Sequence, residues 1–442
     1  MTDVGIEVIT LLAFGGLLIT VFLGIPLVFA LGCVALIITY FFWGPASLYL
    51  VGNQIVGMIF NHTLISVPFF LFMANVLARS GIAEDFYDAM YKWMGPLRGG
   101  LAIGTIIICA LIAAMSGVSA VGVVTMGTIA LPAMLNRRYD KSIATGTILA
   151  GGALGQLIPP SLLAIIFSSM ANLSVGKMFL AGATPGILLV GLFILYVAIR
   201  CGLNKDLGPP LSLEERRSIT LRDKLVSLKV VLPATLLVMG VLGSLFAGIA
   251  SPTESAAVGA LGSLLVAAGN RRLTWEGVMA ACRQTLITST MVIWIAVSSL
   301  LFVSVYAGLG GDAFIRETLE VAGVGRWEVL LVMMLIIFLL GMIMDPVGII
   351  FLTVPIFLPI VESLGFDPIW FGALVIINLE MAYLTPPFGY NLFILKSVAP
   401  KNVSTIDLYK AVPPFVALQA LGLAICIAFP EVITWLPYTL LP

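Results

Sequence analysis

The sequence predicts an all-α polytopic membrane protein made of two inverted repeats, each with one re-entrant helical hairpin and one discontinuous helix. Three observations predict this fold class. First, 60% of the 442 residues are hydrophobic and only 10% are charged, so most of the surface must face lipid. Second, apolar stretches of roughly 20 residues, enough for a helix to cross a bilayer, recur along the chain. Third, the two halves share proline landmarks at a common spacing.

The proline landmarks define the repeat. Leu131-Pro132 precedes Pro159-Pro160 by the same number of residues that separates Leu358-Pro359 from Pro386-Pro387. Apolar matches occur easily in so hydrophobic a chain, so these prolines carry the comparison. They predict three regions: a first inverted repeat over 1–200, a connecting arm over 201–229 and a second inverted repeat over 230–442.

The first repeat begins with scaffold helices. The apolar segment at about 99–135 then has length for two helices, but Ser116-Gly117-Val118-Ser119 interrupts it. We expect a hairpin that enters the membrane halfway and returns, although two full helices joined by a Gly/Ser turn would also fit. The next helix, over about 142–172, is broken at Pro159-Pro160, because proline removes amide donors.

The connecting arm is the longest polar interval of the chain. It contains Pro209-Pro210, Glu214-Glu215 and Arg216-Arg217. Paired charges among apolar residues are typical of a short amphipathic helix that lies on a membrane surface. We therefore expect the arm at the cytoplasmic face.

The second repeat follows the same order upside down. Its hairpin, at about 327–364, is interrupted by Met344-Asp345-Pro346-Val347-Gly348. Its broken helix, at about 368–399, is interrupted at Pro386-Pro387. The hairpin of this half would therefore enter from outside.

The basic residues set the orientation, because Lys and Arg are enriched on the cytoplasmic side of membrane proteins. If both hairpins return to the side from which they enter, only Lys177, Arg316 and Arg326 among the 22 Lys and Arg residues lie opposite the rest. The basic face would be the cytoplasmic face of a bacterial inner membrane, with both termini outside. Arg316 and Arg326 could contact a docking protein or simply face solvent.

Interruptions at membrane depth predict a ligand site. Exposed backbone is costly in hydrocarbon, so irregular backbone persists there only where it lines a cavity or binds something. Freed carbonyls and hydroxyls suit a hard cation such as sodium, and helix N-termini suit a carboxylate. The sequence has no Walker-type phosphate loop and no His-Glu-x-x-His or Gly-x-Ser-x-Gly motif. We therefore expect a transporter driven by an ion gradient, not an enzyme.

Five segments resemble a known family: Ser116-Gly117-Val118-Ser119, residues 155–161, residues 251–257 (Ser-Pro-Thr-Glu-Ser-Ala-Ala), Gly341-Met342-Ile343-Met344-Asp345 and residues 384–392 (Leu-Thr-Pro-Pro-Phe-Gly-Tyr-Asn-Leu). With them, essentially the whole chain resembles the large membrane subunit of tripartite ATP-independent periplasmic (TRAP) transporters. The resemblance implies an elevator-type fold like that of the ion-transporter superfamily and a sodium-coupled importer of small organic acids. It implies two protein partners, a small four-helix membrane subunit and a periplasmic solute-binding protein. A self-sufficient sodium/dicarboxylate symporter is the alternative, and neither an organic cofactor nor nucleic acid is expected.

The interrupted segments supply the expected site residues. Sodium ligands are expected at Ser116, Ser119, Gly155, Asp345, Ala382 and Thr385, and substrate contacts at Gly117, Pro159, Pro160, Pro386, Pro387 and Asn391.

Some polar residues have a purely structural alternative. Ser116 and Ser119 could only satisfy helix ends, and Asp345 and Asn391 could only cap helices. Glu380, in the helix before the second proline pair, could take part in ion coupling or pair with a buried polar group, and it stays outside the expected ligands. For Glu254 the segment Ser251-Pro252-Thr253-Glu254 predicts a structural capping box.

Overall fold

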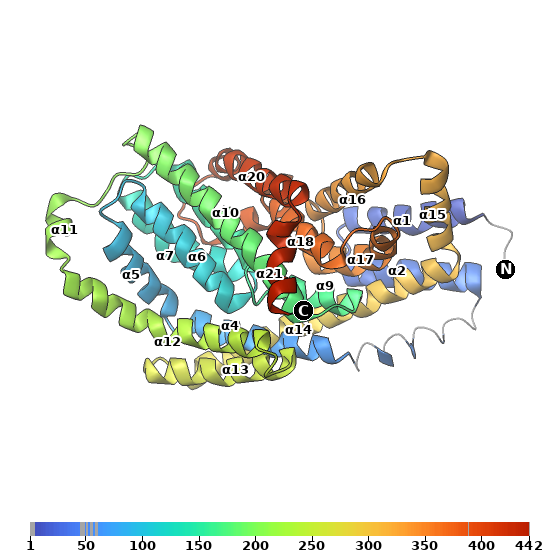
Figure 1. The fold of residues 1–442 in the computed structure, drawn as a ribbon, viewed down its shortest axis with the longest axis horizontal. Helices are drawn as coiled ribbons and strands as arrows, with labels where there is room; N and C mark the ends of the chain where they lie inside the picture. The colour runs from blue at the N-terminus through green and yellow to red at the C-terminus, as the bar shows by residue number, and fades with distance from the viewer. Residues whose placement is uncertain are drawn as a thin grey trace.

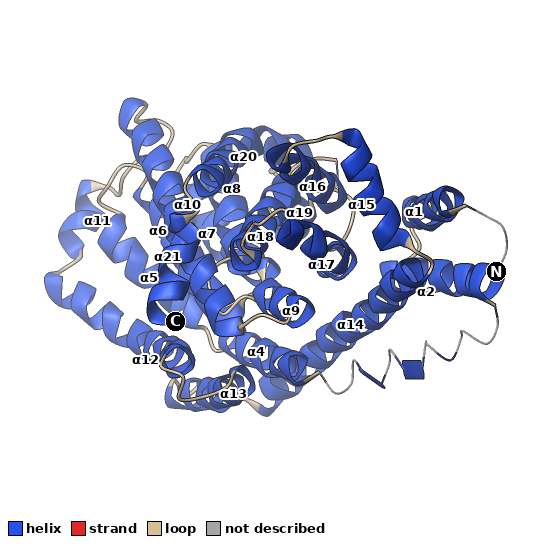
Figure 2. Ribbon diagram, turned by 45° about the vertical axis from the view of Figure 1, so that its right-hand side comes forward, coloured by secondary structure: helices blue, strands red, loops and turns tan. Residues whose placement is uncertain are grey.

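The computed structural model describes residues 5–44, 49, 52–53, 56–57, 61–387 and 389–441. The side chains of residues 230, 316 and 319–322 lie outside this description, so the expectation for the Arg316 side chain does too, as does Phe388 in the second proline segment. Every regular element in the described ranges is helical, which confirms the all-α prediction (Figure 2).

The first half places its interruptions where the sequence predicts them. Two of its helices, α6 and α7, meet at Gly117-Val118, and a third is broken before Ser161. In chain order the elements are α1 (Ile6–Phe22), α2 (Leu27–Ile38), η1 (Thr39–Trp43), α4 (His62–Arg79), α5 (Ile82–Met94), α6 (Gly100–Ser116), α7 (Ser119–Asn136), α8 (Lys141–Ala153), η3 (Leu154–Gln156), α9 (Leu162–Ala171) and α10 (Val175–Leu203).

The second half follows a similar order after the arm. Two helices, α16 and α17, flank the segment before Pro346, and α18 ends at Leu384, just before the second proline pair. In chain order the elements are α11 (Leu213–Ser218), α12 (Leu221–Phe246), α13 (Pro252–Gly269), α14 (Trp275–Gly308), α15 (Gly311–Ala322), α16 (Arg326–Gly341), α17 (Pro346–Ser363), α18 (Pro368–Leu384), α19 (Tyr390–Val398), α20 (Thr405–Ala428) and α21 (Glu431–Leu440).

Local chemistry explains several of these helix ends. Asp140 caps α8 by accepting from the Ser142 amide at 2.9 Å, and Asp367 caps α18 by accepting from the Ile369 amide at 2.7 Å. The expected capping box at the start of α13 is present, with Ser251 and Glu254 bonded to each other's backbone. These contacts confirm the structural interpretation of Glu254.

The connecting arm holds a short helix and the beginning of a long one. Helix α11 opens with a capping box between Ser212 and Glu215. Helix α12 then starts inside the expected arm and bends by 42° between Leu221–Lys229 and Val231–Phe246. The bend therefore falls at the predicted end of the arm.

Helix α14 is the longest element and runs along one side of the molecule (Figure 1). It packs on α4 near one end, on α2 near the other and on α17 between them. The hairpin and broken-helix elements lie together on the other side of α14 (Figure 2). Ring contacts join the two halves there, with Phe167 of α9 6.3 Å from Phe371 of α18 and Phe193 of α10 5.7 Å from Phe415 of α20.

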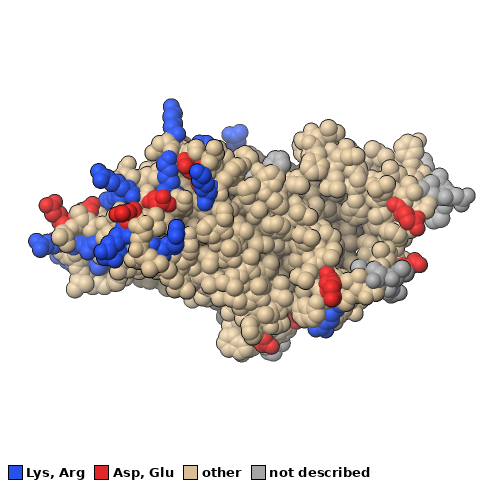
Figure 3. Space-filling model, turned by 90° about the horizontal axis from the view of Figure 1, so that it is seen from above, with Lys and Arg blue, Asp and Glu red and all other residues tan. Residues whose placement is uncertain are grey.

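The outer surface is that of a membrane protein. Six described helices are long and apolar enough to cross a bilayer, namely α4, α7, α10, α14, α17 and α20, and the bent α12 would make seven. On the face that Figure 3 draws, Lys and Arg gather at one end of the molecule, and the middle is nearly free of charge. The chain is therefore a multi-pass membrane protein.

Candidate functional site

The tip between α6 and α7 packs against the first broken helix. Gly117 adopts a left-handed backbone conformation with φ 62°, and its carbonyl accepts from the Leu162 amide at 3.3 Å. A Cβ atom at Gly117 would collide with the Pro160 carbonyl oxygen. Only glycine fits this contact, so Gly117 lets the tip approach the proline segment closely.

Gly155 lies on the other side of the same contact. A Cβ atom there would stand 3.0 Å from the Val118 carbonyl oxygen and 3.1 Å from the Ser119 Cα atom. Ser116, whose hydroxyl bonds to the Val118 backbone at 3.3 Å, completes the tip. Ser116, Gly117, Ser119, Gly155 and Pro160, all of them expected site residues, thus form one buried cluster.

Ser119 connects this cluster to the second half. Its hydroxyl donates to the Asn391 side-chain oxygen at 2.6 Å, and both residues are fully buried. Neither residue caps a helix, since Val118 and Gly389 occupy the N-cap positions of α7 and α19 without side-chain cap bonds. The side-chain nitrogen of Asn391 has no hydrogen-bond partner among the described residues, so a donor remains at the start of α19.

The expected site residues of the second half form hydrogen bonds mainly at the ends of their own helices. Asp345 caps α17 by accepting from the Val347 amide at 3.0 Å. The Thr385 hydroxyl donates to the Met381 carbonyl at 2.8 Å, and the Thr385 amide donates to the Ala382 carbonyl at 3.0 Å. Ala382 is buried against Gly341, where an added Cβ atom would stand 2.6 Å from the Ala382 Cβ atom. The end of α16 therefore packs on the end of α18.

The two proline pairs differ in exposure. Pro159 and Pro160 are buried, whereas Pro387 is exposed and its carbonyl accepts from the Tyr409 hydroxyl at 3.5 Å. Both proline–proline peptide bonds are cis. The first proline pair thus lies inside the protein, and the second lies nearer its surface, whereas Asn391 beyond it is buried.

Sequence reasoning missed two polar residues between these clusters. Tyr383 is fully buried in α18, lies close to the Gln156 side chain, and has its ring 5.9 Å from the ring of Tyr390. Gln156, 5% exposed, ends η3 in the first broken helix. Both lie in strongly apolar surroundings, and a polar side chain at membrane depth is a functional signal that could have identified them.

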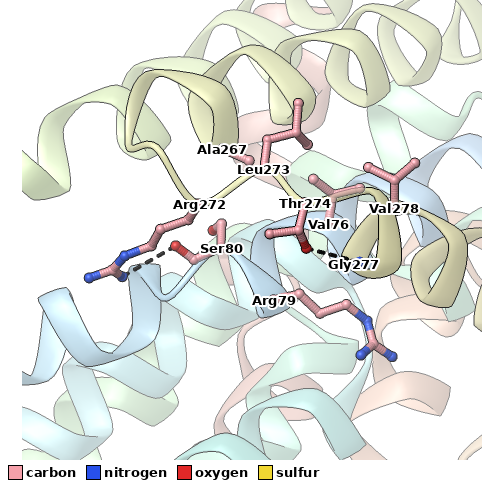
Figure 4. A pocket seen from close by; sticks show the side chains of 9 residues that line it. All are labelled: Val76, Arg79, Ser80, Ala267, Arg272, Leu273, Thr274, Gly277 and Val278. Atoms are coloured by element: carbon pink, nitrogen blue, oxygen red, sulfur yellow. Dashed lines mark hydrogen bonds between the residues drawn. The ribbon is translucent and has the colours of Figure 1, made fainter.

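A polar pocket lies away from these clusters, where α4 ends and α13 leads into α14 (Figure 4). Arg272 lies beside Ser80 there and donates to the Ser80 carbonyl at 3.3 Å. It also pairs with Asp85 of α5 at 3.2 Å. Because no expected site residue lines this pocket, it is a joint between helices and not part of the candidate site.

Known transport proteins resemble this chain over most of its length. The sequence pattern of the family described as "Tripartite ATP-independent periplasmic transporter, DctM component" matches residues 14–432. The C4-dicarboxylate TRAP transporter large permease protein DctM of Vibrio cholerae is 31% identical over 441 residues, covering 95% of each chain. The ectoine TRAP transporter large permease protein TeaC of Halomonas elongata is 30% identical over 422 residues, covering 94% of this chain and 95% of that one.

A solved structure supports the fold alone. The YdaH transporter of Alcanivorax borkumensis aligns with a TM-score of 0.64 at 14% identity, over 88% of this chain and 90% of that one. The family match covers nearly the whole chain, and the named relatives are permeases. This chain therefore belongs to the DctM-component family of tripartite ATP-independent periplasmic transporters, and it is a transporter permease subunit rather than an enzyme.

Proposed function

We propose that this chain is the transport subunit of a sodium-coupled secondary active importer of small organic acids in the bacterial inner membrane. It would act with a small four-helix membrane subunit and a periplasmic solute-binding protein. The observation that carries the proposal is the buried bond between Ser119 and Asn391, which joins a hairpin tip of one half to the broken helix of the other. Family membership supports the partners, and the C4-dicarboxylate named for the Vibrio cholerae relative supports a carboxylate substrate.

The proposal includes inverted repeats with re-entrant hairpins. The repeat is supported by reciprocal packing, because α7 packs on α19 while α17, which has the same length of 18 residues, packs on α9. Re-entrance of the first hairpin is supported by the burial of its tip, where Ser116 is 5% and Ser119 0% exposed. A loop at an aqueous surface would leave such hydroxyls wet. The proposal also includes an elevator movement of these elements against the remaining helices.

The proposed ligands fall into two chemical groups. Oxygen atoms at Ser116, Ser119, Gly155, Asp345, Ala382 and Thr385 would hold sodium, since hard cations prefer oxygen ligands. For the substrate, the first amides of α19 and the unpartnered Asn391 nitrogen are donors that suit a carboxylate. The chain segments at Gly117 and at the two proline pairs would line the remaining space.

Reconstitution tests the function. Proteoliposomes with this chain and the small membrane subunit should accumulate labelled C4-dicarboxylate only with an inward sodium gradient and added binding protein. A potassium gradient of equal size is the control for membrane potential and osmotic effects. Uptake by this chain alone would favour the self-sufficient symporter, and uptake independent of sodium would contradict the proposed coupling.

A further inference from the structure

Glu380 is a buried carboxylate that the proposed ligand sets do not use. It lies in α18, is 0% exposed, and neither of its carboxylate oxygens has a hydrogen-bond partner among the described residues. No Lys or Arg in the described part of the chain forms an ion pair with it. An uncompensated charge at such depth is strongly unfavourable, so its surroundings must supply a counterpart.

The first broken helix faces this carboxylate. The backbone amide of Leu157 points toward Glu380, but that amide already donates to the Leu154 carbonyl at 3.1 Å. The Leu157 carbonyl lies against Gly182 of α10, where an added Cβ atom would collide with it. Backbone groups of this turn therefore leave the charge of Glu380 largely uncompensated.

Two further oxygens lie beside Glu380. Neither the side-chain oxygen of Gln156 nor the hydroxyl of Tyr383 has a hydrogen bond of good geometry among the described residues, although the Tyr383 hydroxyl lies close to the Gln156 side chain. Helix α18 and η3 pack on each other, which brings the three side chains to one junction. The junction thus combines one carboxylate, one amide oxygen and one hydroxyl, all within the protein interior.

A cation and a proton would satisfy this junction in different ways. A proton on Glu380 would cancel the charge and, together with the Tyr383 hydroxyl, would supply donors to the neighbouring oxygens. A monovalent cation would be coordinated by all three side chains at once and would balance the carboxylate charge. Oxygen ligands of this kind suit a hard cation such as sodium.

We propose that Glu380, Gln156 and Tyr383 form a further sodium site at the junction of η3 and α18. The site rests on the proposed sodium coupling and is separate from the hairpin-tip ligands. Its ligands come from both halves, so binding would depend on how closely the first broken helix approaches α18. The Tyr390 ring lies 5.9 Å from the Tyr383 ring, and the Asp345 carboxylate adds to the negative field at Tyr383.

Sodium binding to the purified full-length chain in detergent tests the proposal. The measurements are the number of bound ²²Na⁺ ions and the rise of the unfolding midpoint with sodium, with choline as the inert cation. Glu380→Gln should remove one bound ion or weaken one site about tenfold or more, since it deletes the charge of the ligand set. Tyr383→Phe should weaken the same site less, because it removes one neutral oxygen. Glu254→Gln, the same chemical change in an exposed capping box, should leave binding unchanged.

The outcomes separate this site from the proposed function. If the wild-type chain binds no sodium, the proposed coupling fails and this site with it. If the wild-type chain binds sodium and both Glu380→Gln and Tyr383→Phe bind it equally well, only the further site is overturned. Unchanged sodium binding with an altered pH dependence in Glu380→Gln would assign a proton to the junction and would also overturn it. Tyr383→Phe preserves the test should Glu380→Gln fail to fold.

Discussion

Single residues fix the contact between the first hairpin tip and the broken helix. Gly117 combines a positive φ with a close approach to the Pro160 carbonyl, whereas Gly155 leaves room for the backbone of Val118. The absence of a side chain is what both positions contribute. Substitution here should therefore act through geometry, without removing any polar group.

Gly117→Ala should destabilise the tip and abolish transport. Gly248→Ala is a matched control, because Gly248 has φ 67° but nothing lies within 4 Å of an added Cβ atom. We expect Gly248→Ala to cost about 1 kcal/mol, from left-handed strain alone. Gly117→Ala should cost about 1–3 kcal/mol more, from the collision. Thermal unfolding of the two purified variants measures the difference, and equal midpoints would contradict the tight contact.

Thr385→Ala should weaken the sodium dependence of uptake. Its hydroxyl donates within α18 but keeps lone pairs that can face an ion, so its loss should raise the sodium concentration for half-maximal uptake about tenfold. Thr128→Ala removes an equivalent bond, from Thr128 to the Val124 carbonyl at 2.8 Å, at an exposed position of α7. A normal sodium response in Thr385→Ala, with expression equal to that of the control, would remove Thr385 from the ligands.

Among the elements, the connecting arm joins the first half through backbone bonds, such as Gly99 to Gly208 at 2.8 Å, and its helix α11 does so through one carboxylate. Glu215 of α11 accepts from the Tyr91 hydroxyl of α5 and pairs with Arg137 beside α7, both at 3.1 Å. The Arg137 guanidinium also lies over the Tyr91 ring, 5.1 Å from its centre. The arm is therefore held at the entrance of the first hairpin.

Acid should loosen helix α11 from the first half. The Ser212 backbone amide first, and then the Ser212 hydroxyl, Tyr91 and Arg137, hold the pKa of Glu215 below its ordinary value of 4.5. A lowered pKa means that the contact is fully present above pH 4.5 and is lost as the pH falls through the folded-state pKa. The protection of residues 212–218 against hydrogen exchange, relative to the intrinsic exchange rate at each pH, should fall as the pH drops through the folded-state pKa of Glu215. Glu215→Gln should show fast exchange at neutral pH, whereas Glu214→Gln should behave as wild type.

Over the whole molecule, the hairpin and broken-helix elements of the two halves pack reciprocally. Helix α14 of the second half runs beside these elements. Helix α14 contacts α17, and an added Cβ atom at Gly348 would stand 3.6 Å from the Ile295 side chain. If the hairpins move against the remaining helices, this contact must break during each cycle. It is therefore the place to test an elevator movement.

A disulfide between Gly348→Cys and Ile295→Cys should block uptake, and a reductant should restore it. The Leu27 side chain must shift to admit the new cysteine, so Gly348→Cys alone is needed to show that uptake survives the substitution. The control is a disulfide between Ser244→Cys and Ser255→Cys. Their parent hydroxyls are 3.2 Å apart in α12 and α13, which both belong to the remaining helices. Full uptake by the oxidised Gly348–Ile295 variant would contradict relative movement.

The sequence by itself determined the helical class, the membrane environment and the positions of the interruptions. Hydropathy, proline and glycine act locally, so the helix ends at Ser116, Ser119 and Leu384 could be predicted without knowing what packs against them. Only the tertiary structure decided which side chains meet. Ser119 and Asn391 are 272 residues apart, and the junction of Gln156, Glu380 and Tyr383 needs both halves in place. Such partners are chosen by packing across the whole chain, and no local pattern encodes that packing.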